Sequence, residues 1–262
     1  MKYLALGPGA MGLFVFLGLL YKMQESGSLD DLEEISGASA GALVGFLFLI
    51  SNRNSSKALD FALTVPIKQI MKPNIKSLLK EYGLVPLRKV RKIFQEGCLK
   101  FTNKIDLTFR ELYELTPVKF HVAAFCVDVM RTEYFSVDRT PDMSVTEAVC
   151  MSIAVPFLFS VSKWNDWHYV DGGTAETTPC GPFIGKDRSQ VKCVKFAWSR
   201  ANEITNLRSY ALSILFSALR MRATYDFPTI DIDLGDADVF DFDAELESKI
   251  RLFMLGQSQQ IS

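Results

Sequence analysis

The sequence predicts an α/β fold, with three α/β/α layers around a mostly parallel central sheet. Two observations lead to this prediction: apolar strand-like runs alternate with helix-like runs along the chain, and short Gly-rich turns join them. The chain of 262 residues is long enough to bury a substantial core, and we expect a single domain over residues 1–262. A composition of 48% hydrophobic and 23% charged residues is typical of globular proteins and excludes a disordered chain.

The first fifty residues contain two strand–turn–helix units. Lys2–Leu6 is an apolar run that we expect to form the first strand, and a Gly-rich turn leads from it into a helix over Ala10–Met23. The second strand, Glu34–Ser36, is short and leads through another turn into an apolar helix over Ala40–Ile50. Neighbouring parallel strands carry the turns that follow them at the same edge of a sheet, so the two turns should lie side by side.

The segment 52–115 is helical in pattern, basic and interrupted by three prolines, and we expect it to cover one edge of the sheet as a lobe or lid. Its Lys68–Lys104 part has ten basic and two acidic residues, whereas Asp226–Glu247 has nine acidic residues and no Lys or Arg. The basic part is either ordinary solvated surface or a face that contacts anionic lipid headgroups.

The remaining chain predicts strands and helices that continue the α/β order. The expected strands are Val118–Cys126, Thr132–Val137, a run near Val161, His168–Val170, Val191–Trp198 and Thr229–Leu234. The expected helices are Val145–Ser152, Asn206–Thr224 and Asp243–Leu255. We expect Asp241 or Asp243 to cap the last helix and Gly256 to end it.

Charge and cysteine usage indicate the cellular compartment of the protein. A net charge of −1 gives no global field for nucleic acid, and the five scattered cysteines are typical of reduced thiols in an intracellular protein. The apolar runs Ala10–Tyr21 and Ala40–Ile50 are too short to span a bilayer. We therefore expect a soluble, cytoplasmic protein with peripheral contact at anionic membranes; the sequence gives no indication of its oligomeric state.

Gly37-Ala38-Ser39-Ala40-Gly41 is a G-x-S-x-G pattern between the second strand and its helix. In this context the pattern is typical of a nucleophile elbow, a sharp turn that leaves the serine hydroxyl exposed at a helix N-terminus. Unpaired N–H groups at that end of a helix favour negative charge. The hypothesis makes Ser39 a catalytic nucleophile, and the alternative is a turn of small residues that serves only packing.

The first turn, Gly7-Pro8-Gly9-Ala10-Met11-Gly12, is a G-x-G-x-x-G pattern with three interpretations. A dinucleotide site needs an acidic residue at the end of the second strand, and the sequence has none there. A plain tight turn is the second interpretation. The third is an oxyanion hole, in which the N–H groups of Gly9, Ala10 and Ala40 stabilise the charge that acyl transfer builds on a carbonyl oxygen. Pro8 has no N–H to contribute.

A catalytic serine needs a base, and the sequence offers two histidines and an aspartate. His121 lies in a strand-like run and His168 three residues before Asp171; a lone histidine in a strand is more often structural. Asp171 ends an apolar strand and precedes Gly172 and Gly173, a D-G-G turn in which the aspartate commonly has a structural role. The residue pattern alone leaves these alternatives open. With only two histidines and no Cys/His cluster, we expect no metal site and no cofactor.

Taken in order, the motifs resemble the patatin-like phospholipase family over nearly the whole chain. That family has a Gly-rich oxyanion motif, G-x-S-x-G, a small-residue stretch that ends in proline, and D-G-G or D-G-A. The matching segments here are Gly7–Gly12, Gly37–Gly41, Ser152–Pro156 and Asp171–Gly173. The resemblance implies a patatin-like fold and a Ser-Asp dyad without histidine, in which Ser39 is the nucleophile and Asp171 the base.

The resemblance also implies a function: a lipid acyl hydrolase of phospholipase A or lysophospholipase type that works through an acyl-enzyme. Phospholipid or another acyl lipid is then the substrate. The chain departs from the family pattern at Leu6, where Asp is usual, at Pro8, where Gly is usual, and at Met11, where Arg or Lys is usual; Thr177–Pro179 stands where an Asn is common. These departures favour an alternative, a catalytically weak or inactive lipid- or partner-binding protein on the same scaffold.

Overall fold

The structure, a computed structural model, describes residues 1–197, 210 and 225–261. Its centre is a mixed sheet with the strand order β10-β9-β1-β2-β4-β8-β7, and β5 pairs with β4 beside this path. Five neighbouring strands are parallel: β10 (Thr229–Asp233), β9 (Val191–Ala197), β1 (Tyr3–Leu6), β2 (Glu34–Ala38) and β4 (Lys119–Cys126). The prediction of an α/β fold around a mostly parallel sheet is confirmed.

The sheet becomes antiparallel on the far side of β4. There β4 pairs with β5 and β8, and β8 pairs with β7, all in antiparallel fashion. The bounds of these strands are Arg131–Phe135 for β5, Ser162–Trp164 for β7 and Trp167–Asp171 for β8. Strand β8 is antiparallel to β4, so the position of its last residue, Asp171, depends on the register in which the two strands pair. That register determines the geometry of the site described below.

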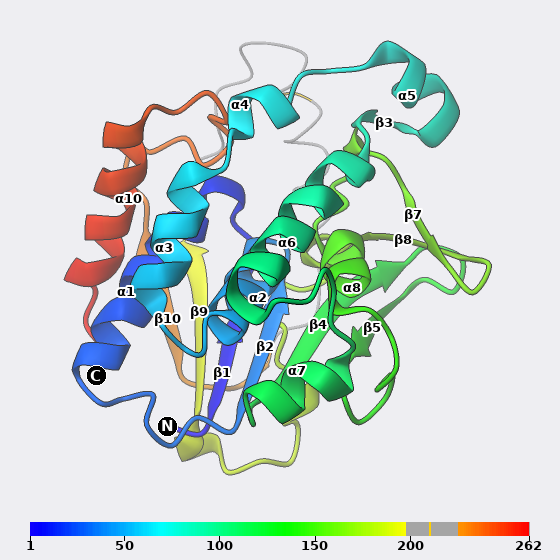
Figure 1. Cartoon of the computed structure of the whole chain (residues 1–262). Coiled ribbons are helices and arrows are strands. Elements are labelled where there is room, and N and C mark those ends of the chain that lie inside the picture. The colour runs from blue at the N-terminus through cyan, green and yellow to red at the C-terminus, as the bar shows by residue number, and fades with distance from the viewer. Residues whose placement is uncertain (198–209, 211–224, 262) are drawn as a thin grey trace.

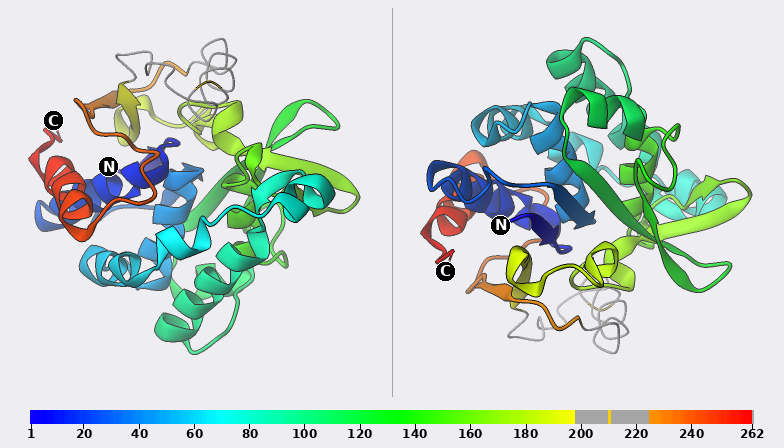
Figure 2. Two further views of the ribbon diagram at one scale, coloured as in Figure 1. Left: turned by 90° about the horizontal axis from the view of Figure 1, so that it is seen from above. Right: turned by 90° about the horizontal axis from the view of Figure 1, so that it is seen from below.

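Five helices lie over one face of the sheet, and the segment 172–190 lies against the other (Figures 1 and 2). These helices are α1 (Leu13–Glu25), α2 (Ala40–Ile50), α3 (Ser55–Thr64), α6 (Leu87–Thr102) and α10 (Leu246–Ser258). Each step from β1 to β2 to β4 moves in the same direction along the sheet, so right-handed crossovers put the intervening helices on the same face. Ten of the eleven residues of α2 are buried, which explains why this helix is apolar all round.

The segment 52–115, called the lobe below, contains five helices and one short strand. Its residues 67–85 lie beside the carboxyl ends of the parallel strands, whereas residues 109–115 lie at the amino end of β4, which they precede (Figure 1). The helices are α3 (Ser55–Thr64), α4 (Ile67–Ile70), α5 (Ile75–Glu81), α6 (Leu87–Thr102) and α7 (Phe109–Leu115). The strand β3 (Gly83–Val85) pairs in parallel with β6 (Phe157–Phe159), a second sheet that the sequence pattern did not indicate. Among the described helices, none is both long and apolar enough to cross a bilayer.

Most expected elements occur within a few residues of their predicted bounds, and α2 and α8 (Val145–Ser152) match them fully. The helix expected from Ala10 begins as a 3-10 turn over Ala10–Gly12 before α1 starts. The helix expected over Asn206–Thr224 and the end of the strand at Trp198 lie outside the described residues.

The prediction for the last helix was wrong at both ends. Helix α10 spans Leu246–Ser258, and Glu245 is its N-cap, without a side-chain hydrogen bond. Asp241 instead accepts a hydrogen bond from the amide of Asp243, which closes a turn upstream of the helix. Gly256 lies inside α10, where a Cβ would stand 2.0 Å from Val15 O, so this glycine allows α10 to pack closely against α1 and does not end the helix.

Candidate active site

Ser39 occupies a strained turn between β2 and α2. Its backbone angles are φ 54° and ψ −119°, a region that residues other than glycine rarely adopt. The sharp turn requires close backbone contact, because a Cβ on Gly41 would lie 2.0 Å from Leu6 O. The amide of Gly41 donates to Gly7 O at 3.1 Å, which ties this turn to the first Gly-rich turn. The two turns therefore lie side by side, as the strand order predicts.

The pairing register of β4 brings Asp171 to Ser39. Consecutive residues of β4 pair with two different strands: Ala123 pairs with Ala38, the last residue of β2, and Ala124 pairs with Asp171, the last residue of β8. One residue after Ala38 is Ser39. Ser39 and Asp171 are distant in sequence, and the adjacent β4 residues Ala123 and Ala124 bring them close together.

A short stretch after helix α8 holds the backbone of both residues. The amide of Ser39 donates to Ser152 Oγ at 2.9 Å, and the amide of Asp171 donates to Ala154 O at 2.9 Å. Ser152 and Ala154 are two residues apart at the end of α8, in the small-residue stretch that the sequence singles out. This stretch therefore links the strained turn at Ser39 to the end of β8.

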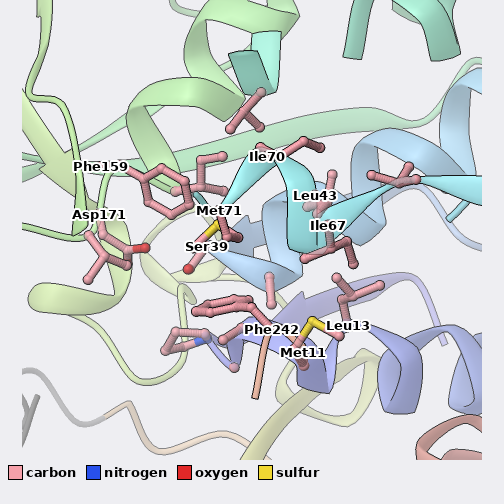
Figure 3. Close-up of a pocket in the computed structure, with 18 of the residues that line it drawn as sticks. Met11, Leu13, Ser39, Leu43, Ile67, Ile70, Met71, Phe159, Asp171 and Phe242 are labelled. Atoms are coloured by element: carbon pink, nitrogen blue, oxygen red, sulfur yellow. The ribbon is translucent and has the colours of Figure 1, made fainter. Parts of the chain in front are cut away.

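Asp171 is a buried carboxyl group, with 3% of its surface exposed. Its Oδ1 accepts a hydrogen bond of 2.7 Å from the amide of Gly173. Its Oδ2 has no full hydrogen bond within the described part of the chain, although the Ser39 hydroxyl lies close enough to affect its titration. Burial raises the pKa of Asp171 to about 7, against the lowering effect of the Ser39 hydroxyl and the Gly173 amide. Figure 3 shows the two side chains directed toward each other.

The first Gly-rich turn leaves two N–H groups without a partner. The amide of Gly7 donates to Val194 O, that of Met11 to Val239 O, and that of Gly12 to Gly9 O. Within residues 1–197 and 225–261, the amides of Gly9 and Ala10 have no acceptor, and both residues line the same pocket as Ser39. Ala40 lines it too, as the first residue of α2, where an N–H has no partner within the helix.

The glycines around these turns are positions where a side chain has no room. A Cβ on Gly173 would lie 2.5 Å from the Pro8 ring and 2.8 Å from Asp171 Oδ1. Pro8 thus packs directly against the turn that orients the Asp171 carboxyl. A Cβ would also come within 2.0 to 2.5 Å of a neighbouring atom at Gly7, Gly9, Gly12, Gly37 and Gly172.

Ser39 and Asp171 open into an apolar cavity of ≈ 160 Å³ (Figure 3). Thr174 provides the only other polar side chain among the described residues that line it. The rest of the lining is aliphatic, aromatic or methionine, and it comes from the 3-10 turn, α1, α2, the lobe and the loops near residues 153–159 and 240–242. The lobe contributes residues from α3, α4 and α6. The site is thus one polar pair at the end of an apolar cavity.

The chain matches a known protein family. The sequence model of the family described as patatin-like phospholipase matches residues 4–184, which is more than half of the chain. The chain belongs to the patatin-like phospholipase family. The matched range includes all four motifs on which the sequence resemblance rests.

Individual relatives of this patatin-like chain are distant in sequence. It is 25% identical over 269 residues to a protein named probable lipid hydrolase 463L from Invertebrate iridescent virus 6, covering 98% of this chain and 87% of that protein. Among solved structures, VipD from Legionella pneumophila has a TM-score of 0.66 at 18% identity, and the type III effector ExoU of Pseudomonas aeruginosa has a TM-score of 0.53 at 16%. Both structural matches cover 98% of this chain, which spans only 65% of VipD and 51% of ExoU.

Two of the departures from the patatin-like pattern are buried in the fold, and Pro8 is half-buried. Leu6 is fully buried at the end of β1, and Met11 is 1% exposed, with its side chain lining the cavity. An apolar side chain therefore faces the cavity where the family usually has a basic one. Pro8 packs against Gly173, as described above, and directly precedes Gly9, whose amide has no acceptor within residues 1–197 and 225–261.

The two histidines lie outside the cavity of this patatin-like domain. His121 Nε2 is 2.8 Å from Glu34 Oε2, and Lys186 Nζ is 2.7 Å from the other oxygen of Glu34. Glu34 and His121 are buried, whereas Lys186 is exposed, and the His121 ring packs against Phe183 of the segment 172–190. His168 Nδ1 is 3.2 Å from Asp128 at the β4–β5 turn. Neither histidine lines the cavity with Ser39. Ser152 is not among the site residues predicted from the sequence, although it is the first residue of the small-residue motif Ser152–Pro156.

Proposed function

We propose that this chain is a lipid acyl hydrolase in which Ser39 and Asp171 act as a catalytic dyad. The observation that carries the proposal is a strained serine beside a buried aspartate of raised pKa, both at the polar end of an apolar cavity. Asp171 accepts the proton of the Ser39 hydroxyl as Oγ attacks an ester carbonyl. The same proton then passes to the leaving alcohol, and the acyl group stays on Ser39.

Water completes the cycle. Asp171 accepts a proton from water as the water oxygen attacks the acyl-enzyme, and the proton returns to Ser39 Oγ when the fatty acid leaves. The negative charge that develops on the carbonyl oxygen in both halves needs fixed donors. The amides of Gly9 and Ala10, supported by that of Ala40, are the candidates, because they are unpaired and line the cavity.

The pKa of Asp171 supports its role as a base. A carboxylate with an ordinary pKa near 4 is a weak base toward a serine hydroxyl. Burial raises the pKa of Asp171 to about 7, so the group is a stronger base and is still largely ionised slightly above neutral pH. This scheme requires neither a metal ion nor an organic cofactor.

The lining of the cavity supports an acyl-lipid substrate. Transfer of a hydrocarbon chain from water to apolar walls is favourable by roughly 25 cal/mol per Å² of buried surface. Side chains such as Leu43, Leu47 and Phe94 provide such walls next to Ser39. We propose that the lobe 52–115 completes the acyl-binding wall through α3, α4 and α6, and that the activity is of phospholipase A or lysophospholipase type.

A second function, binding without catalysis, is favoured by one observation. Met11 gives the cavity an apolar side chain where relatives usually have a basic one, and Pro8 removes a donor from the glycine turn. A catalytically weak or inactive lipid- or partner-binding scaffold would tolerate both changes. Such a protein would retain the apolar cavity and lose reactivity at Ser39.

An active-site-directed fluorophosphonate probe separates the two functions. We expect the wild-type protein to be labelled at Ser39, and Ser39→Ala to be unlabelled while melting at a similar temperature. Incubation with a panel of phospholipids, lysophospholipids and triacylglycerols, followed by mass spectrometry, should show fatty acid released by the wild type alone. Hydrolysis that persists in Ser39→Ala would contradict the dyad, and absence of both labelling and release would favour the binding function.

A further inference from the structure

Helix α5 and the β3–β6 pair form an exposed tip beside the cavity, outside the proposed catalytic groups. Four large apolar side chains stand in solvent there: Ile75 is 71% exposed, Leu79 76%, Tyr82 66% and Phe157 69%. Large apolar side chains grouped on a surface indicate an interaction site, whereas isolated ones need no explanation. These four come from one short helix, its last cap and the strand pair behind it. Figure 1 shows α5 projecting beyond the rest of the lobe.

Basic residues flank the apolar side chains of the tip. Lys72, Lys76 and Lys80 are all exposed, and no ion pair involves them within the described part of the chain. Ile75 and Leu79 are four residues apart, as are Lys76 and Lys80, so the helix presents an apolar stripe next to a basic one. The buried Ser77 marks the side of α5 that faces the protein.

The remaining basic residues of the Lys68–Lys104 segment are mostly paired. Arg88 pairs with Glu81, Arg91 with Glu147, and Lys104 with Glu111. Lys68 lies 3.8 Å from Asp243, where the acidic segment reaches the lobe. Lys72, Lys76 and Lys80 are therefore three of the six basic residues of this segment that form no ion pair within the described part of the chain; the other three, Lys89, Lys92 and Lys100, lie on α6. In Figure 1 the acidic segment near α10 lies on the other side of α4 from α5.

The tip is an ordered structure and not a loose loop. Asn74 caps α5 through a hydrogen bond of 3.2 Å from the amide of Ser77 to its side chain, and its own amide donates to Leu84 O at 2.7 Å. The amide of Val161 donates to Glu81 O at 3.1 Å. These bonds hold α5 in place, so the protein presents its apolar side chains to solvent in a fixed arrangement.

The tip continues directly into the cavity wall along two segments. Met71 lines the cavity and is followed by Lys72, and Phe159 lines the cavity two residues after Phe157. A surface that binds at the tip is therefore adjacent to the wall of the cavity.

We propose that this tip docks the protein on the surface of a bilayer that contains anionic lipid. Apolar side chains would enter the interface while the lysines contact headgroups, as in interfacial amphipathic helices. The combination favours a lipid surface over a protein partner, because protein–protein interfaces are depleted in lysine at their cores. The proposal rests on the proposed lipid substrate for its purpose, and it gives the three unpaired lysines of the tip a role in contacting anionic headgroups.

Vesicle co-sedimentation tests the proposal, with Ser39→Ala as the background so that lipids stay intact. The vesicles are phosphatidylcholine alone and phosphatidylcholine with phosphatidylserine. Replacing Lys72, Lys76 and Lys80 with Gln should weaken binding to the anionic vesicles about 100-fold, since each lysine near such a surface contributes about a factor of five. The Ile75→Gln/Leu79→Gln pair should weaken binding to both kinds of vesicle. Added salt should weaken the binding of the parent protein.

A charge-matched control uses three exposed lysines away from the tip, Lys57, Lys100 and Lys104, each changed to Gln; it should bind within about twofold of the parent. Equal binding by the parent and the tip variants, or no binding by the parent at low salt, would overturn the proposal. If the Ile75→Gln/Leu79→Gln pair alters only the oligomeric mass, the tip contacts a second copy of the chain and the proposal is also overturned.

Hydrolysis distinguishes failure of the docking surface from failure of the proposed function. With Ser39 intact, the tip variants should hydrolyse a soluble short-chain ester like the wild type and lose activity on anionic vesicles. Tip-dependent binding without any esterase activity would leave the docking surface standing and contradict the hydrolase. Full activity on vesicles in the tip variants would contradict the docking surface alone.

Discussion

The main-chain amide of Ser39 donates to the side chain of Ser152 at 2.9 Å, across 113 residues of sequence. Ser39 has a positive φ, a conformation that persists only when its surroundings hold it. The amide of Asp171 is bound two residues further on, by Ala154 O. The end of α8 therefore fixes the backbone of the proposed nucleophile and base relative to each other, although it supplies no reacting atom.

Ser152→Ala should lower kcat about tenfold and leave KM nearly unchanged, because a buried N–H without a partner costs about 1–3 kcal/mol and lets the turn relax. The measurement is steady-state hydrolysis of a soluble ester, together with the rate of fluorophosphonate labelling. Ser152→Thr retains the hydroxyl and should restore most of the activity. Ser36→Ala is a matched control, since Ser36 is a fully buried serine on β2 whose hydroxyl has no hydrogen-bond partner within the described residues. Equal effects of Ser36→Ala and Ser152→Ala would indicate a general packing loss.

Glu34→Gln should destabilise the protein at neutral pH and much less in acid. Burial alone would raise the pKa of Glu34, but hydrogen bonds from His121 and Lys186 outweigh it and lower the pKa to about 2. A lowered carboxylate pKa stabilises the fold above the ordinary value of 4.5, and this stability is lost as pH falls toward 2.

Thermal melts of wild type and Glu34→Gln across pH 2–7 measure this effect, and the difference between the two melting temperatures should shrink below about pH 4.5 and vanish near pH 2. Glu33→Gln is the control, because Glu33 forms an exposed ion pair with Lys2, and such pairs contribute little. A constant difference between wild type and Glu34→Gln at every pH would mean that the cluster acts through packing and not through charge.

Local patterns predicted the helices and the motif residues well, and they failed where distant segments meet. The bounds of α2 follow from an apolar run after a glycine turn, and the predicted bounds of α8 also match the structure. The β3–β6 pair joins three-residue strands that are far apart in sequence, so neither has a local signature. Gly256 lies where α10 packs against α1, and this glycine was predicted to end the helix because the sequence does not show the contact.

The sequence could name Ser39 and Asp171 but not the physical state of the site. The resemblance indicated both residues, whereas their juxtaposition depends on the register of β4 with β2 and β8. The raised pKa of Asp171 comes from burial, which only the assembled core produces. Nothing in the sequence distinguishes Ser152 from other serines, and its role follows only from the hydrogen bond that its hydroxyl accepts from the Ser39 amide.

Asp171→Asn should abolish hydrolysis and at the same time stabilise the fold. An amide cannot accept the serine proton at neutral pH, so activity should fall to the level of Ser39→Ala. The folded-state pKa of Asp171, about 7, lies above the ordinary value of 3.8, so ionisation in the folded protein costs stability. That loss grows as pH rises from about 4 to 7 and then levels off.

The stability effect of Asp171→Asn is measured by thermal melts of the variant and the wild type. The variant should melt at the same temperature as the wild type near pH 4 and at a higher temperature at pH 8. Asp142→Asn, at an exposed position, should show no such trend. A variant that is inactive but less stable at pH 8 would mean that the ionised form of Asp171 stabilises the fold, contrary to its burial with no positive partner among the described residues.

The pH dependence of kcat/KM on a soluble ester should report the same carboxyl group. Because the base acts only when ionised, activity should fall about tenfold per pH unit below 7 and reach a plateau above it.

A histidine base would give a similar curve, so the histidine variants are decisive. Changing His121 and His168 to Gln, singly and together, should leave the midpoint near pH 7 and the plateau within a few-fold of wild type. His121 belongs to the Glu34 cluster, so each variant must first be shown by melting to be folded at the assay pH. If the midpoint shifts or the plateau collapses in a folded histidine variant, while Asp171→Asn stays active, the base is a histidine and the dyad is wrong.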